Sequence, residues 1–414
     1  MTASSATHQD SREQETSRRP QATFTFDYEQ LDAIPQLDQR WAWLEISRSA
    51  IRHNVAEMRR YLNKHTRIMA VVKADGYGHG AVEVSKAALG SGAEQLAVST
   101  VSEGVELRKA GITAPIVILE QPPATSLPVL LGYNITPSIY EPDYAIAYAE
   151  VADLHGVEAP YHLAVNTGMN RVGVPFSEAA EFLRAVDFHR ALRLHGVFTH
   201  FATAESPETL DFQIQQNRFC DALDDIRAAG FNPGLVHAAN SAALMRFPDV
   251  HFDMVRCGIA MYGIHPCEET RNYFELRPAM SIRARIIDVR KLPVSEGVSY
   301  GFAYRSPGNV KTCTLPLGYA DGLRRVLSGK IDFIMDGRYF RQVGNICMDQ
   351  CMFEVDLRNR ANLGAFNPKV GDEVIVVGRQ GAAEVTMEEL AEKAGTIPYE
   401  MLTGFAQRMP RVYV

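Results

Sequence analysis

Six polar or charged residues stand at or just beyond the ends of short apolar runs. They are Lys73 in VVKADGYGHG, Arg171 in NTGMNRVG, His200 in VFTHFATAE, Asn240 and Ser241 in HAANSAA, and Arg256 in MVRCGIAMYG. A lysine can bond covalently to a carbonyl group, an arginine binds anions through paired hydrogen bonds, and a serine donates a hydroxyl. If the apolar runs are parallel strands of one barrel, their carboxyl ends bring these side chains together.

The apolar runs alternate with stretches that have the period of a helix, which is typical of an α/β fold. The runs are Ile68–Val72, Gln95–Ser99, Pro115–Leu119, Ile135–Ile139, Tyr161–Val165, Leu194–Thr199, Leu235–Ala238 and Phe252–Val255. The helical stretches include Arg52–Lys64, Val82–Gly90, Ser177–Val186 and Leu210–Ala229. Eight strands in this alternation predict a (β/α)8 TIM-type barrel over residues 41–273, with its active site at the carboxyl ends of the strands.

After Tyr273 the alternation gives way to short strands divided by turns, which predicts a mainly β C-terminal domain over residues 274–414. The expected strands are Ser281–Val289, Lys311–Pro316, Ile331–Asp336, Phe340–Ile346 and Glu373–Val377. A strand at 41–46 could pair with either domain. Residues 1–40 begin with a polar stretch that has almost nothing to bury, and we expect them to form a disordered N-terminal tail.

Composition excludes several classes of protein. The formal net charge is -7 and no basic stripe is present, so nucleic acid is not an expected partner. We expect no membrane segment, because no apolar run approaches the ~20 residues of a membrane helix, and the first 40 residues lack a signal-peptide core. The six cysteines are scattered without a CxxC pair, which favours reduced thiols in a cytoplasmic protein and no metal site.

The predicted seventh and eighth strands are followed by residues suited to a phosphate group. Loops at this position of a barrel are a frequent phosphate site. The Ser241 hydroxyl and the backbone N–H groups of Gly258 and Ile259 can donate hydrogen bonds there. A lysine such as Lys73 at the same barrel mouth indicates pyridoxal 5'-phosphate bound through that lysine. For a lysine taken alone, an exposed loop position is the more common explanation.

The motif VVKADGYGHG resembles the cofactor-lysine motif of alanine racemases. The similarity continues in family order through NTGMNRVG, THFATAE, HAANSAA, MVRCGIAMYG, VSYGFAY, LPLGYADG, GNICMDQ and TIPYE, and covers most of residues 41–411. The resemblance implies a barrel followed by a β domain, pyridoxal 5'-phosphate as cofactor, and a homodimer with shared active sites. It also implies interconversion of L-alanine and D-alanine, which supplies D-alanine for cell-wall peptidoglycan.

The resemblance assigns roles to individual residues. Lys73 and Tyr300 resemble the two opposed acid/base groups, with Tyr300 contributed by the partner subunit. Phosphate contacts are implied for Tyr77, Ser241, Gly258, Ile259 and Tyr399. Arg256 resembles the arginine at the pyridine nitrogen, and His237 resembles the partner of that arginine. His200 and Asn240 resemble residues that support the cofactor ring. Arg171 and Met348 resemble contacts to the substrate carboxylate, and Arg171 would also lie beside the cofactor's phenolic oxygen. Without the resemblance, Tyr300 and the two histidines would as readily be core residues.

Three positions depart from the family pattern. Many relatives carry a carbamylated lysine where this chain has Ala164, an aspartate where it has Asn166, and several carry an arginine where it has Asn345. The nearest residue in sequence that could orient Arg171 is Asn166. Either a small anion such as chloride or water is expected to fill the space at Ala164.

Other functions remain open on the sequence alone. The pocket residues also suit racemisation of serine or another small amino acid. A fold-related decarboxylase of basic amino acids would carry an acid where Arg256 stands. A non-catalytic protein that binds pyridoxal phosphate would be a single barrel without the segment VSYGFAY.

Overall fold

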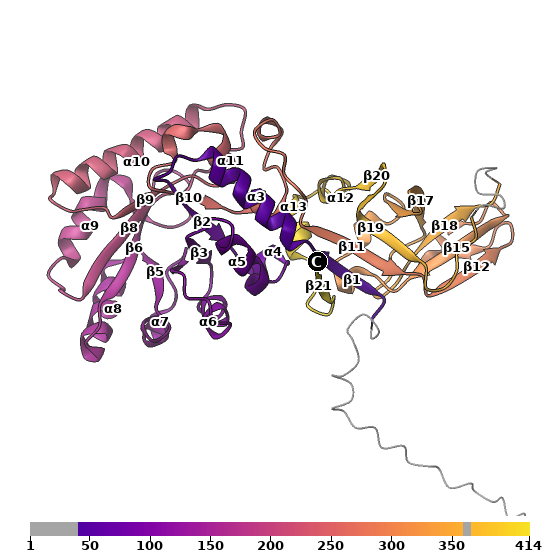
Figure 1. The fold of residues 1–414 in the computed structure, drawn as a ribbon, viewed down its shortest axis with the longest axis horizontal. Coiled ribbons are helices and arrows are strands. Elements are labelled where there is room, and N and C mark those ends of the chain that lie inside the picture. Colours follow the sequence, from indigo (N-terminus) through magenta and orange to yellow (C-terminus); the bar gives the residue numbers. More distant parts are fainter. Residues whose placement is uncertain (1–39, 359–365) are drawn as a thin grey trace, which may run out of the picture.

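The computed structural model describes residues 40–358 and 366–414, and the predicted tail at 1–40 lies outside the described residues except for Arg40. The chain forms a barrel and a β domain that lie side by side (Figure 1). The prediction of an α/β barrel followed by a mainly β domain is confirmed.

Within the described residues, eight parallel strands close the barrel, because β2 pairs with β10 and β5 pairs with β6. They are β2 (Arg67–Val71), β3 (Gln95–Val98), β4 (Ile116–Ile118), β5 (Ile135–Ile139), β6 (Ala159–Asn166), β8 (Leu192–Phe198), β9 (Leu235–His237) and β10 (Met254–Cys257). Each overlaps one of the predicted apolar runs. The strands are mostly buried on both faces, which explains why they read as continuous apolar runs.

Helices lie around the strands and connect them (Figure 1). They are α3 (Arg48–Tyr61), α4 (Lys73–Tyr77), α5 (Ala81–Leu89), α6 (Val101–Lys109), α7 (Leu127–Gly132), α8 (Pro142–His155), α9 (Ala179–Val186), α10 (Leu210–Ala228) and α11 (Ser241–Arg246). Helix α9 shows the sequence logic: Phe182, Leu183 and Val186 are buried on one side, while Glu181 and Arg184 remain exposed. A two-residue strand, β7 (Val174–Pro175), adds to β6 outside the barrel circuit.

The β domain is built on a mainly antiparallel sheet, in which the pairing of β1 with β21 is parallel. Its strands are β11 (Met280–Arg285), β12 (Asp288–Leu292), β15 (Val310–Leu315), β16 (Asp332–Met335), β17 (Arg338–Val343), β18 (Cys351–Asp356), β19 (Glu373–Gln380), β20 (Ala383–Val385) and β21 (Arg411–Tyr413). The short hairpin β13 (Gly297–Val298) and β14 (Tyr304–Arg305) and the helices α12 (Met387–Ala394) and α13 (Pro398–Thr403) complete the domain.

The prediction of one strand over Ser281–Val289 is wrong. The strand ends at Arg285 and a new one begins at Asp288, because β11 pairs with β1 and β19 whereas β12 pairs with β15. Ile286 and Ile287 form the bend between two regions of the sheet. Both segments are apolar enough to read as one strand, and only tertiary pairing separates them.

Strand β1 (Ala42–Ile46) belongs to the sheet of the β domain. It pairs antiparallel with β11 and parallel with β21, so its neighbours are formed by the last third of the chain. The Ser47 side chain then caps α3 by accepting from the Ala50 N–H at 3.1 Å. The chain therefore begins in the β domain, builds the barrel and returns.

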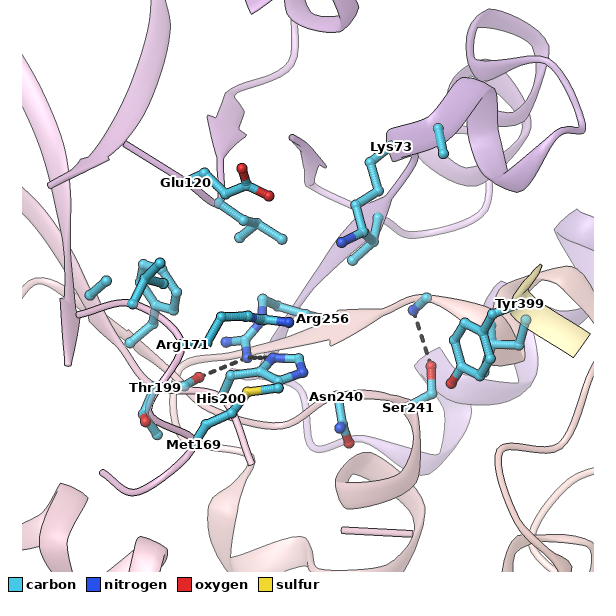
Figure 2. Close-up of a pocket in the computed structure, with 18 of the residues that line it drawn as sticks. Lys73, Glu120, Met169, Arg171, Thr199, His200, Asn240, Ser241, Arg256 and Tyr399 are labelled. Atoms are coloured by element: carbon cyan, nitrogen blue, oxygen red, sulfur yellow. Dashed lines mark hydrogen bonds between the residues drawn. The ribbon is translucent and has the colours of Figure 1, made fainter. Parts of the chain in front are cut away.

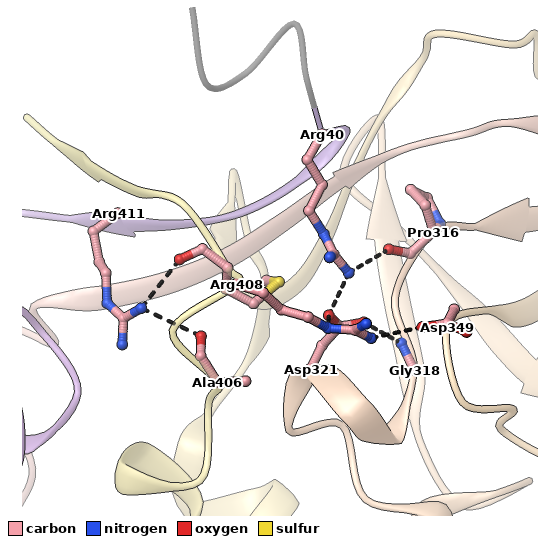
Figure 3. A network of polar contacts seen from close by, with 9 residues as sticks. Arg40, Pro316, Gly318, Asp321, Asp349, Ala406, Arg408 and Arg411 are labelled. Atoms are coloured by element: carbon pink, nitrogen blue, oxygen red, sulfur yellow. Dashed lines mark hydrogen bonds and ion pairs between the residues drawn. The ribbon is translucent and has the colours of Figure 1, made fainter. Parts of the chain in front are cut away.

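Asp321 joins three segments of the β domain (Figure 3). Its side chain is fully buried and accepts hydrogen bonds from Arg40, from Arg408 Nε at 2.7 Å and from the Gly318 N–H at 2.8 Å. Arg408 also donates to Asp349 at 2.8 Å. This carboxylate therefore ties the segment before β1, the turn at Gly318 and the C-terminal segment to the loop that carries Met348.

Candidate active site

A cavity of about 890 Å³ opens at the carboxyl ends of the barrel strands (Figure 2). Ten of the thirteen residues to which the resemblance assigns a role line it: Lys73, Tyr77, Arg171, His200, Asn240, Ser241, Arg256, Gly258, Ile259 and Tyr399. They come from β10, from the segments after β2, β6, β8, β9 and β10, and from α13 of the β domain. The barrel thus brings together residues that lie up to 326 positions apart in the sequence.

Lys73 is followed by a left-handed turn. Ala74, Asp75, Gly76 and Tyr77 all have positive φ, between 52° and 60°, a conformation that costs non-glycine residues roughly 1–2 kcal/mol each. The turn is held from outside: Glu103 accepts from the Ala74 N–H at 2.7 Å, and Asp75 accepts from the Ala81 N–H at 2.9 Å. These hydrogen bonds therefore stabilise the strained backbone at the point where Lys73 and Tyr77 enter the cavity.

The surroundings of Lys73 favour its neutral form. Burial lowers the pKa of Lys73 below its ordinary value, and the positive charge of Arg171 lowers it further, while Glu120 and Glu103 oppose the shift. Figure 2 shows Lys73 and Glu120 on the same side of the cavity, across from Arg171 and Arg256. A lysine with a lowered pKa is a better nucleophile and a better base near neutral pH.

Arg256 is buried beneath the cavity and held by neutral acceptors. It donates to the backbone oxygens of Thr199, His237 and Ala238 at 2.8–3.1 Å, and to the ring nitrogens of His237 at 2.9 Å and His200 at 3.1 Å. Burial, and then the charge of Arg171, lower the pKa of Arg256 to about 9, so the guanidinium stays charged at neutral pH. The cavity therefore has a fixed cation in its floor.

The segment after β10 forms a cradle for a small anion. The Ser241 hydroxyl accepts from the Gly258 N–H at 3.0 Å, and Asn240 caps α11 by accepting from the Ala243 N–H at 2.9 Å. A Cβ at Gly258 would lie 2.9 Å from the Tyr77 hydroxyl, so only glycine leaves this space open. Burial raises the pKa of Tyr77 to about 12, which keeps its hydroxyl a donor.

These residues fit pyridoxal 5'-phosphate. The phosphate group matches the cradle of Tyr77, Ser241 and Gly258, since the two hydroxyl groups can donate there and Gly258 leaves the space open. Lys73 can bond to the aldehyde carbon. Arg256 supplies donors on the floor between them, as expected for a partner of a ring nitrogen.

Arg171 lies at the rim of the cavity without a hydrogen-bond partner among the described residues. Ala164 is buried and lines the cavity nearby. The Asn166 side chain does not orient Arg171: its oxygen accepts from the N–H groups of Gly168 and Asn170 at 3.0 Å, and its amide donates to Asn170. Asn166, the nearest candidate in sequence, therefore does not hold the guanidinium, because its side chain bonds within its own loop.

Tyr300 and Met348 lie on the β domain, away from the cavity of the same chain. Their exposed fractions are 75% and 53%, high values for a tyrosine and a methionine. The Tyr300 loop includes positive φ angles at Ser299, Gly301 and Phe302. The backbone carbonyl of Met348 accepts from the Ala320 N–H at 3.0 Å. A single chain thus leaves these two predicted site residues on the surface, and it does not bring Tyr300 to Lys73.

Sequence reasoning missed three acidic residues of the site: Glu103, Glu120 and Glu205. Glu103 holds the Lys73 turn, and it also forms a capping box with Thr100 at the start of α6. The TxxE spacing is a signal for this cap, but not for the contact with Ala74. Glu205 accepts from the Tyr399 hydroxyl at 3.2 Å across the cavity wall. No local pattern links Glu205 with Tyr399, since the two residues are 194 positions apart in the sequence.

A mouth cavity with a lysine, a buried arginine and an anion cradle defines an enzyme of the (β/α)8-barrel class. The family model of the alanine racemase N-terminal domain matches residues 46–266, and that of the alanine racemase C-terminal domain matches residues 279–413. The chain therefore belongs to the alanine racemase family.

Individual relatives agree with the family. A protein of Desulforamulus reducens named alanine racemase is 42% identical over 374 residues, which are 90% of this chain and 98% of that protein. The crystal structure of alanine racemase from Bacillus anthracis is 35% identical, with a TM-score of 0.84, covering 91% and 95% of the two chains. A histidine racemase from Leuconostoc mesenteroides is 29% identical, with a TM-score of 0.82, covering 91% and 98%.

No helix of residues 40–358 and 366–414 is long and apolar enough to cross a membrane.

Proposed function

We propose that this protein interconverts L-alanine and D-alanine with pyridoxal 5'-phosphate, in the cytoplasm, and so supplies D-alanine for peptidoglycan. The observation that carries the proposal is the convergence of Lys73, Arg256 and the Tyr77–Ser241–Gly258 cradle in one cavity, in a chain of the alanine racemase family. Lys73, Tyr77, His200, Asn240, Ser241, Arg256, Gly258, Ile259 and Tyr399 would hold the cofactor.

Racemisation requires one group on each face of the substrate Cα. Lys73 takes the proton from one face, the electron pair of the broken C–H bond stays on carbon, and Tyr300 of the partner subunit returns a proton to the opposite face. The reverse direction exchanges the two roles. Bound cofactor would supply a conjugated, electron-withdrawing ring that stabilises the negative charge at Cα. The lowered pKa of Lys73 supports its role as a base.

Arg256 and Arg171 would interact with charged or electron-rich groups and would not transfer the proton themselves. Arginine does not give up its proton in proteins, so Arg256 can donate to a ring nitrogen but cannot protonate it. With Arg256 as its partner, bound cofactor would supply a weaker electron-withdrawing group at Cα than a protonated ring would. Arg171 at the rim, with the backbone at Met348 of the partner subunit, would bind the substrate carboxylate.

A homodimer completes the site in this proposal. Tyr300 and Met348 are exposed on the β domain, while the cavity with Lys73 is open at the barrel mouth. Mixing Lys73→Ala protein with Tyr300→Ala protein should restore part of the activity, because one of the two sites in a mixed dimer then has both groups. Mixed dimers without recovered activity would show that each chain completes its own site.

The experiment that tests the function is a substrate panel. Purified protein is incubated separately with L-alanine, L-serine, L-histidine and L-lysine, and the D-enantiomer is measured by chiral chromatography. We expect the highest kcat/KM with alanine. Reduction with borohydride should attach the cofactor to the peptide that contains Lys73, and attachment to any other lysine would refute its assignment.

The second candidate is a racemase of serine or another small amino acid. The observations that favour it are Ala164 and Asn345, which leave a smaller side chain or a neutral one where many relatives carry a charged group. The substrate panel decides between the two candidates, since the preferred substrate has the highest kcat/KM.

A further inference from the structure

Arg256 carries a buried charge that no carboxylate neutralises. Its side chain is 3% exposed, and within residues 40–358 and 366–414 its hydrogen-bond acceptors are three backbone oxygens and two imidazole nitrogens. A buried cation without a counter-ion depends on the orientation of the dipoles around it. The imidazoles are the acceptors whose direction can reverse, because each can carry its proton on either ring nitrogen.

The hydrogen-bond order beneath Arg256 determines where the protons of two histidines lie. Arginine only donates, so His237 Nδ1, 2.9 Å from Arg256 Nη1, must be the acceptor. His237 then carries its proton on Nε2, which lies 2.8 Å from His162 Nδ1. His162 must accept there and carry its own proton on Nε2. Burial keeps both rings neutral, lowering the pKa of His162 to about 3 and that of His237 well below its ordinary value.

The barrel interior is shaped to hold this pair. His162 lies on β6 opposite Gly196 of β8, and a Cβ at Gly196 would approach the imidazole of His162 to 2.7 Å. The ring of His237 stacks on Phe198, with centroids 4.9 Å apart and planes 8° apart. The Arg256 guanidinium also lies over Phe198, at 5.4 Å. Phe198 therefore packs on the face of the His237 ring, and only a glycine at position 196 leaves room for the His162 ring.

We propose that His162 is a positioning residue for the cofactor-facing arginine: by accepting from His237 Nε2, it holds the ring of His237 in the orientation that accepts from Arg256. Among residues 40–358 and 366–414, His162 is the acceptor that His237 Nε2 has. Without His162 this buried proton is unsatisfied, and it cannot move to Nδ1, because Nδ1 faces an N–H of Arg256. The ring of His237 would then turn toward another partner, and the guanidinium would lose one acceptor.

This inference rests on the proposed function only where it refers to catalysis. The tautomers of His162 and His237 are properties of the folded barrel, and they can be measured whatever the substrate is. Imidazole nitrogens labelled with 15N give distinct NMR shifts for protonated and unprotonated positions. In the cofactor-bound protein at pH 7, we expect both residues to be protonated on Nε2 only. A proton on Nδ1 of either histidine would overturn the proposal.

Two substitutions separate the role of His162 from simple packing. His162→Leu fills similar space without an acceptor, whereas the amide oxygen of His162→Gln can still accept from His237. We expect His162→Leu to change the 15N shift of His237 Nε2, weaken cofactor binding about tenfold and lower kcat about tenfold, the equivalent of one buried hydrogen bond, with KM for alanine unchanged. His162→Gln should restore this 15N shift and most of the affinity.

The matched control is His251→Leu. His251 is also a buried histidine of the barrel, but its Nε2 bonds to the Leu244 carbonyl at 2.7 Å, outside the Arg256 contacts. We expect its loss to lower thermal stability without changing the 15N shift of His237 Nε2 or the cofactor affinity. Equal effects of His162→Leu and His251→Leu on these readouts would show that His162 is merely structural. If His162→Leu does not fold, the tautomers of the unmodified protein and of His162→Gln decide the question. An absence of racemase activity in the unmodified protein would instead refute the proposed function.

Discussion

The side-chain amide of Asn345 donates a hydrogen bond to the backbone carbonyl of Tyr300, with 2.8 Å between nitrogen and oxygen. The Ser299 hydroxyl donates in turn to the Asn345 carbonyl at 2.6 Å. Asn345, which replaces the arginine that several relatives carry at the substrate entry, therefore holds the loop of Tyr300, the proposed catalytic tyrosine. This loop has positive φ at Ser299 and Phe302 and needs such support.

We expect Asn345→Ala to lower kcat roughly 2–10-fold, because one hydrogen bond of about 0.5–1.5 kcal/mol holds the Tyr300 loop. The measurement is steady-state racemisation with the cofactor saturating. Asn232→Ala is the matched control, since Asn232 caps a turn at Gly234, remote from the site, at 3.0 Å. Equal kcat values for Asn345→Ala and the unmodified protein would mean that the loop holds its position without this bond.

Tyr300→Phe should reduce the racemisation rate roughly 10²–10⁴-fold, the usual contribution of a positioned acid or base. Cofactor absorbance and affinity should be retained, because the residues proposed to hold the cofactor lie on the barrel and α13 and the substitution removes only the hydroxyl of Tyr300. Exchange of the Cα hydrogen with solvent should persist from the enantiomer that presents this hydrogen to Lys73. Equal loss of exchange from both enantiomers would contradict two opposed bases.

The lowered pKa of Lys73 can be measured by amine acylation in protein stripped of cofactor. A lower pKa means a larger neutral fraction at any given pH, so Lys73 should react at lower pH than the exposed Lys64. Arg171→Ala removes a positive neighbour and should move the Lys73 profile toward higher pH. Arg184→Ala, on the exposed side of α9, should leave it unchanged, and an identical shift in both variants would exclude a specific effect of Arg171.

We expect the buried Asp321 carboxylate to contribute far more to the free energy of unfolding than an exposed ion pair does. Replacing a buried charge that pairs with Arg40 and Arg408 leaves these cations without their partner and costs about 3–5 kcal/mol, whereas an exposed pair contributes about 0–1 kcal/mol. Asp321→Asn should therefore lower the urea midpoint strongly. Asp288→Asn, which removes an exposed partner of Arg290, is the control. Comparable midpoints for the two variants would contradict this assignment.

The space at Ala164 leads to a prediction about anions. With Asn166 bonded within its own loop, Arg171 has no acceptor among the described residues. We expect chloride near Ala164 to orient the guanidinium, so KM for alanine should be lower in chloride than in a bulky, non-binding anion at the same ionic strength. Kinetics independent of chloride, with only water beside Arg171 in a crystal, would rule this out.

The barrel was predictable from sequence because its strands are buried on both faces and appear as apolar runs. Lys73, Arg171, His200 and Arg256 followed from the positions of the runs, since the carboxyl ends of parallel strands meet at one mouth, whereas Tyr77 and Tyr399 followed only from the family resemblance. Strand β18 was not predicted, because alternation in CMFEVD is weak and its cysteine and methionine are ambiguous. The contact of Asn345 with Tyr300 joins two loops whose relative position depends on the whole sheet.

The interior below the cavity was predictable only in part. His237 followed from its motif, whereas His162 stands in a buried strand and reads as an ordinary core residue. Its contact depends on the register between β6 and β8 and on the space at Gly196, neither of which has a local signal in the sequence.

The pairing of β1 with β21 has a consequence for biosynthesis. Residues 42–46 leave the ribosome before the barrel strands, yet both of their strand partners come from beyond residue 279. The barrel strands can close as soon as residue 257 is available, while β1 still presents unpaired backbone groups. During translation the nascent chain therefore carries an exposed strand edge attached to a finished barrel, and chaperone binding at this edge would protect the chain until its last residues emerge.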